Sequence, residues 1–321
     1  ERRRQEHHEH AREALELQHQ DGQDGNDHHR EDRHQRVVGG VAFLDGAADV
    51  GLVIADEFHF YSDAQRGVAW VRESFALFLK SPLGFSLLFM LFLVAALILM
   101  ALPFVGALLL LAAMPLLTLG FAAAARAAQR GEAVHAGLLF EPFKGAGDAQ
   151  RRSTLLKLCL LYAATTALVM LLAQAVDGGG FERLQILLAA ERTEANKAQI
   201  DALLDDPRLA GGMLLRLTLI AALSVPFWHA PMLVWWNGQG LAQSLFSSTL
   251  ACWHNKGAFA VNALVWVGVS AAIGVVASII VVLLRAPPLL TLLVPPVVLM
   301  LSAAFYISLY FIHADCFPAA V

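Results

Sequence analysis

The sequence predicts an all-α, polytopic membrane helix bundle of six transmembrane helices, arranged as three hairpins that insert in the same direction. Hydrophobic residues make up 57% of the 321-residue chain and charged residues only 16%. The mean hydropathy is +0.58, and these values together exceed those usual for a water-soluble domain. Charge is concentrated at the start of the chain, and long apolar runs follow it. The net charge of −4 averages these two regions and therefore says little about partners.

Residues 1–57 are predicted to be a disordered, charged segment. The segment is rich in histidine ("HHEH", "HHREDRH") and cannot bury enough apolar surface to offset the entropy of ordering. Its more apolar part, 37–55, is not a good span, because Asp45 and Asp49 would each cost roughly 2.5–3.5 kcal/mol near a bilayer centre. One alternative is a tract that chelates zinc or nickel without fixed ligand spacing. Another is that the segment is not native, since no methionine precedes Met90.

The remaining residues, 58–321, are predicted to form an integral membrane domain. Its apolar runs of about 18–25 residues can each cross about 30 Å of hydrocarbon as a helix. Only "LPFVG" separates the first two runs and "RAPP" the last two, so each of these pairs should form a tight antiparallel hairpin. A long polar loop joins the third and fourth, and it should contain one or two amphipathic helices. The runs are 83–102, 105–127, 154–176, 213–236, 258–284 and 288–312.

The distribution of basic residues predicts the orientation, because Lys and Arg accumulate on the cytoplasmic side of a membrane. Arg66, Arg72 and Lys80 precede the first span, and the linker after the second span is also basic. The linker between the third and fourth spans has four basic residues against seven acidic ones and should face outward. Both termini are therefore expected in the cytoplasm.

Prolines recur in the returning helix of each hairpin: Pro115 in "MPLL", Pro231 in "APML", and Pro295 with Pro296 in "VPPVV". Membrane helices tolerate such prolines when neighbours satisfy the freed carbonyl groups, so we expect kinks at these positions. The recurrence favours a parallel internal repeat. The alternative is that apolar helices resemble one another by composition alone.

Two amphipathic lead-ins strengthen the repeat, since "SFALFLKSPLGF" and "STLACWHNKGAF" align without a gap from Ser74 with Ser248 onward. Each should lie on the cytoplasmic surface before its hairpin. In the first lead-in, Phe75 and Phe78 share an apolar face with Val71. The second lead-in should place Leu241, Leu245, Leu250 and Trp253 opposite Gln243, Ser244 and Ser247. Helix packing is predicted at two stripes of small residues, Gly120, Ala124 and Ala128, and Ser270, Gly274 and Ser278.

Few residues suggest chemistry. His229, beside Trp228 in "PFWHAP", is the main candidate for a ligand or proton site, because the flanking prolines would leave carbonyl groups free. The alternative is a buried neutral histidine that hydrogen-bonds to one of those carbonyls. Gln174 is a second candidate lining residue, or else an interhelical hydrogen-bonding group. Arg216 lies near an outer helix end, where it can extend toward the membrane surface.

Motifs of soluble enzymes are absent from the sequence: there is no Gly-rich phosphate loop, no G-x-S-x-G and no H-E-x-x-H. We predict no catalytic residue, no cofactor, no bound metal and no nucleic-acid partner. Cys159, Cys252 and Cys316 all map to the cytoplasmic half and should stay reduced. Cys252 is expected to be a packing residue rather than a nucleophile.

Three short motifs carry a family resemblance. The chain resembles an uncharacterised family of proteobacterial inner-membrane proteins with six predicted transmembrane helices, and more distantly the membrane region of some glycerophosphodiester phosphodiesterases. The catalytic domain of those phosphodiesterases is absent, and Ala258 stands where the family pattern implies proline. The resemblance implies a bacterial inner-membrane location and brings no substrate. Its residues here are Arg66, Gly67 and Trp70, then Leu77, Phe78 and Pro82, then Ser248, Cys252 and Asn255.

Two functional hypotheses follow. The first is a non-catalytic membrane component whose cytoplasmic segments, around Phe75, Phe78, Cys252 and Asn255, dock a protein partner or organise membrane lipid. The scarcity of buried polar residues favours it. The alternative is a transporter or channel for an apolar or lipid-like solute, which the recurring prolines favour.

Overall fold

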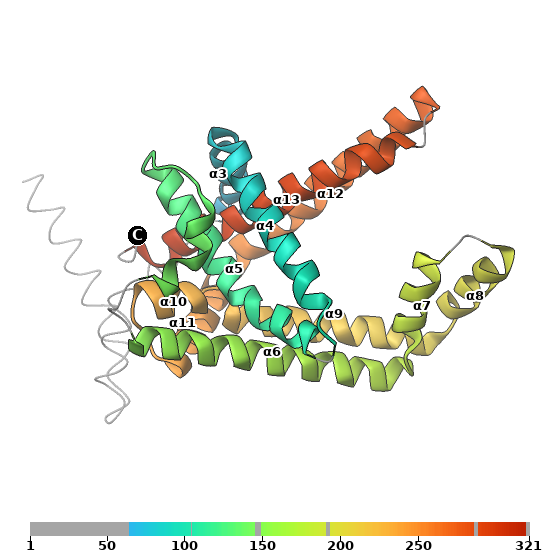
Figure 1. Ribbon diagram of the computed structural model, residues 1–321, viewed down its shortest axis with the longest axis horizontal. Coiled ribbons are helices and arrows are strands. Elements are labelled where there is room, and N and C mark those ends of the chain that lie inside the picture. The colour runs from blue at the N-terminus through green and yellow to red at the C-terminus, as the bar shows by residue number, and fades with distance from the viewer. Residues whose placement is uncertain (1–63, 104, 145–148, 191–192, 286–287, 319–321) are drawn as a thin grey trace, which may run out of the picture. The chain divides into compact units, whose positions relative to one another are not determined.

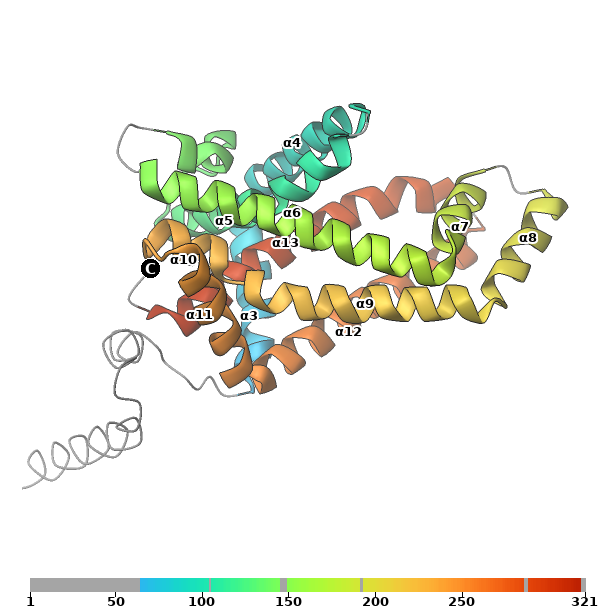
Figure 2. The same cartoon turned by 90° about the horizontal axis from the view of Figure 1, so that it is seen from below.

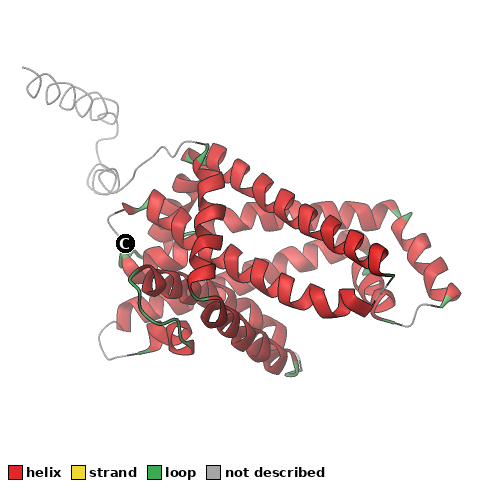
Figure 3. Ribbon diagram, turned by 90° about the horizontal axis from the view of Figure 1, so that it is seen from above, coloured by secondary structure: helices red, strands yellow, loops and turns green. Residues whose placement is uncertain are grey.

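A computed structural model describes residues 64–318 of the chain, apart from 104, 145–148, 191–192 and 286–287. These residues belong to the compact unit Glu57–Val321. The disorder and metal chelation predicted for residues 1–57 fall outside the described part. Regular structure in the described ranges is helical, without a strand (Figure 3).

Six helical segments are long and apolar enough to cross a membrane, as the sequence predicted. The third span begins at Ala149 rather than at residue 154, and the fourth begins at Pro207 rather than at residue 213 and is divided into two helices. The helices are α3 (Arg66–Lys80), α4 (Pro82–Met100), α5 (Gly106–Gln129), the 3-10 helix η1 (Ala136–Phe143), α6 (Ala149–Asp177), α7 (Gly180–Ala189), α8 (Glu194–Leu204), α9 (Pro207–Phe227), α10 (Ala230–Trp236), α11 (Leu241–His254), α12 (Lys256–Leu284) and α13 (Pro288–Cys316).

The spans pair as three successive hairpins, which confirms the predicted helical membrane bundle (Figures 1 and 2). In the middle hairpin α6 packs along α9, and the two amphipathic helices expected in its loop are α7 and α8. We call the end of the bundle that holds α3, η1, α10 and α11 the α3 end. The opposite end, which carries α7 and α8, is the α8 end.

The two lead-ins have matching boundaries. Helix α3 ends at Lys80 and α4 begins at Pro82, while α11 ends at His254 and α12 begins at Lys256. The separation between these equivalent positions equals the separation between Ser74 and Ser248 in the ungapped alignment, so the likeness extends from sequence to helix ends.

Helix α11 differs from the prediction in what its polar face contacts. The apolar side does point away from the chain, with Trp253 68% exposed. The serine side, expected to lie opposite on the surface, is instead buried: Ser244, Ser247 and Ser248 are fully covered, and α11 packs against α9 and α10. Small side chains permit this close approach, and the hydroxyl groups of Ser244 and Ser248 donate to backbone carbonyls.

A close approach also holds α3 against α12. A Cβ atom on Gly67 would collide with the Ala258 carbonyl oxygen and lie 2.7 Å from the Asn262 backbone nitrogen. The Trp70 ring adds an edge-to-face contact with Phe259, at 5.6 Å between centroids. The sequence resemblance flagged Gly67, but only the structure shows that the position excludes a side chain.

Of the two small-residue stripes, only one packs within the described chain. Gly120 and Ala124 are buried, and Gly120 lies against Leu139 of η1. The stripe on α12 does not meet another helix, because a Cβ on Gly274 would have no neighbour within 4 Å among the described residues. The packing predicted for α12 at this face was therefore wrong for the described chain.

The prolines have unequal effects. Pro115 lies inside the uninterrupted helix α5, and Pro295 and Pro296 lie inside α13. Only the fourth span is broken, at Trp228 and His229, and Pro231 occupies the first turn of α10 immediately after the break. A proline in a first helical turn costs no hydrogen bond, so Pro231 fits the start of a new helix.

Candidate polar site at the α3 end

One hydroxyl group forms hydrogen bonds with the backbone groups left unpaired at the break in the fourth span. The backbone N–H of His229 donates to Oγ of Ser248 at 3.0 Å, and that hydroxyl donates to the Val225 carbonyl at 2.8 Å. Ser248 therefore replaces the intrahelical hydrogen bonds lost where α9 ends. The thiol of Cys252 lies 3.7 Å from the same carbonyl oxygen.

Two histidines meet beside this break. The His229 and His313 rings are 5.5 Å apart between centroids, and both residues are completely buried. Phe317 contacts both rings, and Trp236 contacts His313. None of the four ring nitrogens has a hydrogen-bond partner in the described part of the chain. The His229 ring therefore makes no hydrogen bond to a freed carbonyl. Its neighbour His313 was not predicted from the sequence.

Arg126 lies next to the histidine pair. Its guanidinium carbon is 5.1 Å from the centre of the Trp236 ring, a cation–π contact between α5 and α10. Trp236 in turn makes edge contacts with Tyr310 and His313 of α13. Three helices thus meet around one tryptophan. The sequence predicted only that the linker after the second span is basic, and it gave no reason to single out Arg126.

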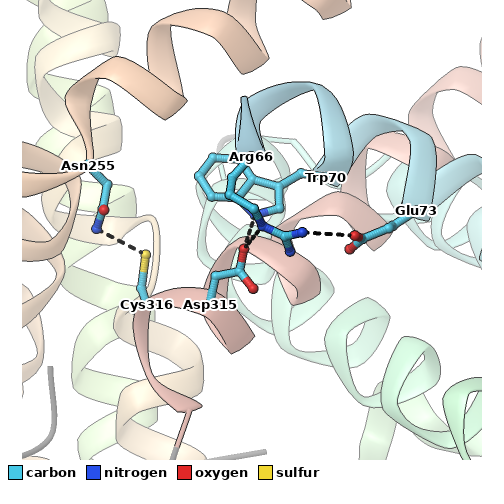
Figure 4. A network of polar contacts seen from close by, with 6 residues as sticks. All are labelled: Arg66, Trp70, Glu73, Asn255, Asp315 and Cys316. Carbon is cyan, nitrogen blue, oxygen red and sulfur yellow. Dashed lines mark hydrogen bonds and ion pairs between the residues drawn. The ribbon is translucent and has the colours of Figure 1, made fainter. Parts of the chain in front are cut away.

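A carboxylate fastens α3 to the end of α13 (Figure 4). Asp315 accepts hydrogen bonds from Nε of Arg66 at 2.7 Å and from the Trp70 indole at 2.6 Å. Arg66 also pairs with Glu73 at 3.2 Å, and its pKa is raised chiefly by the hydrogen bond to Asp315. The Arg66 and Trp70 positions of the resemblance therefore share a structural role. Asp315 itself carried no sequence signal.

The four residues expected to mark the docking segments, Phe75, Phe78, Cys252 and Asn255, all contact their own chain. Phe75 packs on Trp266 of α12, and Phe78 stacks on Phe85. Asn255 is buried and donates to the Cys316 sulfur at 3.5 Å (Figure 4). Cys252 is buried as well, and burial raises the pKa of its thiol to about 12. The expectation that this thiol is a packing group agrees with that environment.

Gln174 lies at the α8 end, away from His229. It is exposed and donates to Glu182 at 3.5 Å.

Nearby, the Arg216 side chain is only 12% exposed and pairs with the fully buried Asp177 at 3.2 Å. The Asp177 carboxylate and the Phe181 ring hold the guanidinium in place, and the extension of Arg216 toward the membrane surface stays a prediction. His229 lies 13 residues beyond Arg216 in the same span, about 20 Å as a helix.

Among the described residues, no group of three or more His, Cys, Asp or Glu side chains is arranged to hold a metal ion. The α3 end therefore offers a pair of unpartnered imidazoles, a stacked arginine and a carboxylate already engaged by Arg66 and Trp70. These groups can bind and orient a ligand or exclude other molecules. Their arrangement does not resemble a nucleophile with its base.

Comparison with known proteins supports the membrane assignment. No family model and no solved structure matches the chain. A probable inner membrane protein of Burkholderia thailandensis is 30% identical over 254 residues, which cover 79% of this chain and 92% of that protein. The Arg-Gly-x-x-Trp start and the likeness to phosphodiesterase membrane regions stay predictions. Because the identity extends over nearly the whole relative, this chain belongs to the same family of inner membrane proteins.

Proposed function

We propose that the protein is a non-catalytic inner-membrane component whose α3 end binds the headgroups of membrane lipid. The observation that carries this proposal is a group of large aromatic side chains left exposed on the short helices of that end. Phe140 and Phe143 of η1 are 55% and 45% exposed, and Phe246 and Trp253 of α11 are 58% and 68% exposed. Aromatic rings on short surface helices favour the headgroup region of a bilayer.

Lipid is favoured over a protein partner because the segments first expected to dock a partner are used within the chain. Phe75 and Phe78 pack on other helices, and Cys252 and Asn255 are buried. Exposed aromatic rings remain on η1 and α11, as lipid contact requires.

The proposal includes an orientation: the α3 end and both chain termini lie on the cytoplasmic side. Its support is the excess of basic residues around α3 and from Arg126 near the end of α5 to Lys157 near the start of α6, against the acidic excess between α6 and α9. Headgroup binding would then occur in the inner leaflet.

Native mass spectrometry of the protein in nanodiscs drawn from its own membranes tests the proposal. We expect lipid retained in stoichiometric amount, and less of it in a Phe246→Ala, Trp253→Ala double variant. Leu217→Ala is the matched control, since Leu217 is equally exposed at 68% but lies within α9. A bound protein in place of lipid, or no bound molecule at all, would contradict lipid binding.

A second candidate is a pathway for a lipid-like solute. The break at Trp228 and His229, with two unpartnered imidazoles beside it, favours this reading because discontinuous spans often form substrate sites in transporters. Gln174 would not share that site. Loss of fluorescent-lipid movement across proteoliposomes in His229→Ala would support transport, and no movement in the wild type would exclude it for the lipid tested.

A further inference from the structure

The arginines of the described chain differ in the groups that their guanidinium contacts. Arg66 has two carboxylates, Arg216 has Asp177, and Arg151 donates to the Trp235 carbonyl at 2.9 Å. Arg126 forms no ion pair with any described acid, and neither does Arg130, which follows it by one turn. Glu132, the acid nearest to them in sequence, is exposed and pairs with neither.

This lack of a counter-charge matters most at Arg126. Its Nε atom is buried and has no hydrogen-bond partner among the described residues, while the guanidinium rests on Trp236. Arg130 follows Arg126 by four residues at the end of α5, so the two side chains lie on the same side of the helix. A partly buried cation without an anion is costly, and the cost falls when an anion occupies the site.

We propose that Arg126 and Arg130 bind the phosphodiester of an anionic phospholipid headgroup, with Trp236 as the wall of the site. This proposal rests on the lipid-binding function above and names its ligand. Guanidinium groups hold phosphate oxygens in paired hydrogen bonds, and basic sites between transmembrane helices bind anionic headgroups.

The position within the fold favours lipid over soluble phosphate, although both offer the same oxyanion. Arg126 occupies the last turn of a spanning helix, which places its charge at headgroup depth. The exposed rings of Phe140 and Phe143 belong to η1, which packs against α5. A headgroup at Arg126 would therefore have room for its acyl chains along an apolar surface.

The experiment uses the full chain in phosphatidylethanolamine nanodiscs with and without phosphatidylglycerol, and it counts bound lipids by native mass spectrometry. Wild-type protein should retain phosphatidylglycerol preferentially. Arg126→Gln with Arg130→Gln should weaken this preference by roughly fivefold per arginine. Arg72→Gln with Lys80→Gln is the matched control, because both residues are exposed near the same end and the pair of substitutions removes the same two charges. Arg126→Lys with Arg130→Lys should keep most of the preference, which separates lost charge from misfolding.

Two results would overturn the assignment. Equal retention of phosphatidylglycerol by the Arg126→Gln, Arg130→Gln variant and by the Arg72→Gln, Lys80→Gln control would remove the site from these arginines. Displacement of the lipid by millimolar inorganic phosphate would identify soluble phosphate as the ligand. Failure to retain any lipid would instead contradict the proposed function as a whole.

Discussion

Two adjacent serines of α11 are both fully buried, yet their hydroxyl groups differ in what they contact. Ser248 accepts from the His229 N–H and donates to the Val225 carbonyl, whereas the Ser247 hydroxyl has no partner among the described residues. Ser248→Ala should therefore cost about 1–3 kcal/mol, because it leaves buried backbone groups unsatisfied. Ser247→Ala should be neutral or slightly stabilising. Thermal unfolding in detergent compares the two, and equal losses would mean that Ser248 does not hold the break together.

Burial controls the chemistry of Cys252 as well. Since burial raises its pKa to about 12, while an ordinary thiol titrates near 8.5, the thiolate should be nearly absent at pH 8. We expect no maleimide labelling of the folded wild-type protein at pH 8, because all three cysteines are buried. Gln243→Cys, on an exposed position of the same helix, should add one label. Rapid labelling of the wild type would show that α11 opens.

The same shift predicts a direction for stability. The folded state keeps the Cys252 proton to a higher pH than the unfolded chain does. The resulting contribution to the stability of the folded state is fully present below about pH 8.5. It is lost as the pH rises toward about 12.

At the level of whole helices, the seating of α3 on α12 depends on one missing side chain. Gly67→Ala would drive a methyl group into the backbone of α12, and overpacking of this kind costs about 1–3 kcal/mol. Gly257 provides the control at the same contact, since a Cβ there would meet Ala64 at an ordinary 3.9 Å. Gly257→Ala should be neutral or stabilising, as alanine favours a helix. If both variants unfold at the wild-type temperature, the contact contributes little.

Much of the element pattern could be predicted from the sequence, because long apolar runs with short polar breaks have few alternatives to spanning helices. The two loop helices and the lead-ins followed from amphipathic periodicity. Periodicity does not tell which face contacts protein and which contacts lipid, so the buried serines of α11 and the open stripe on α12 were missed.

The candidate site was predictable only in part, for a related reason. His229 stood out because prolines flank it, whereas His313, Asp315 and Arg126 lie in segments without a local motif. Their significance comes from contacts between distant segments: Asp315 reaches Arg66, and His313 reaches His229. Sequence position alone does not contain such pairings.

For the molecule as a whole, the sidedness of the membrane domain determines which leaflet the α3 end meets. The orientation can be measured with single cysteines, since the native thiols are buried and should stay silent. Lys197→Cys, exposed on α8, should react with a membrane-impermeant maleimide in intact spheroplasts. Gln243→Cys at the α3 end should react only after lysis.

The reverse labelling pattern would place the basic end outside and contradict the charge asymmetry on which the orientation rests. The stacking of Arg126 on Trp236 would be unchanged, but its ligand would then have to come from the outer leaflet. Sidedness and headgroup preference are therefore separate tests: the first decides which leaflet supplies the lipid, and the second decides whether Arg126 and Arg130 recognise its charge.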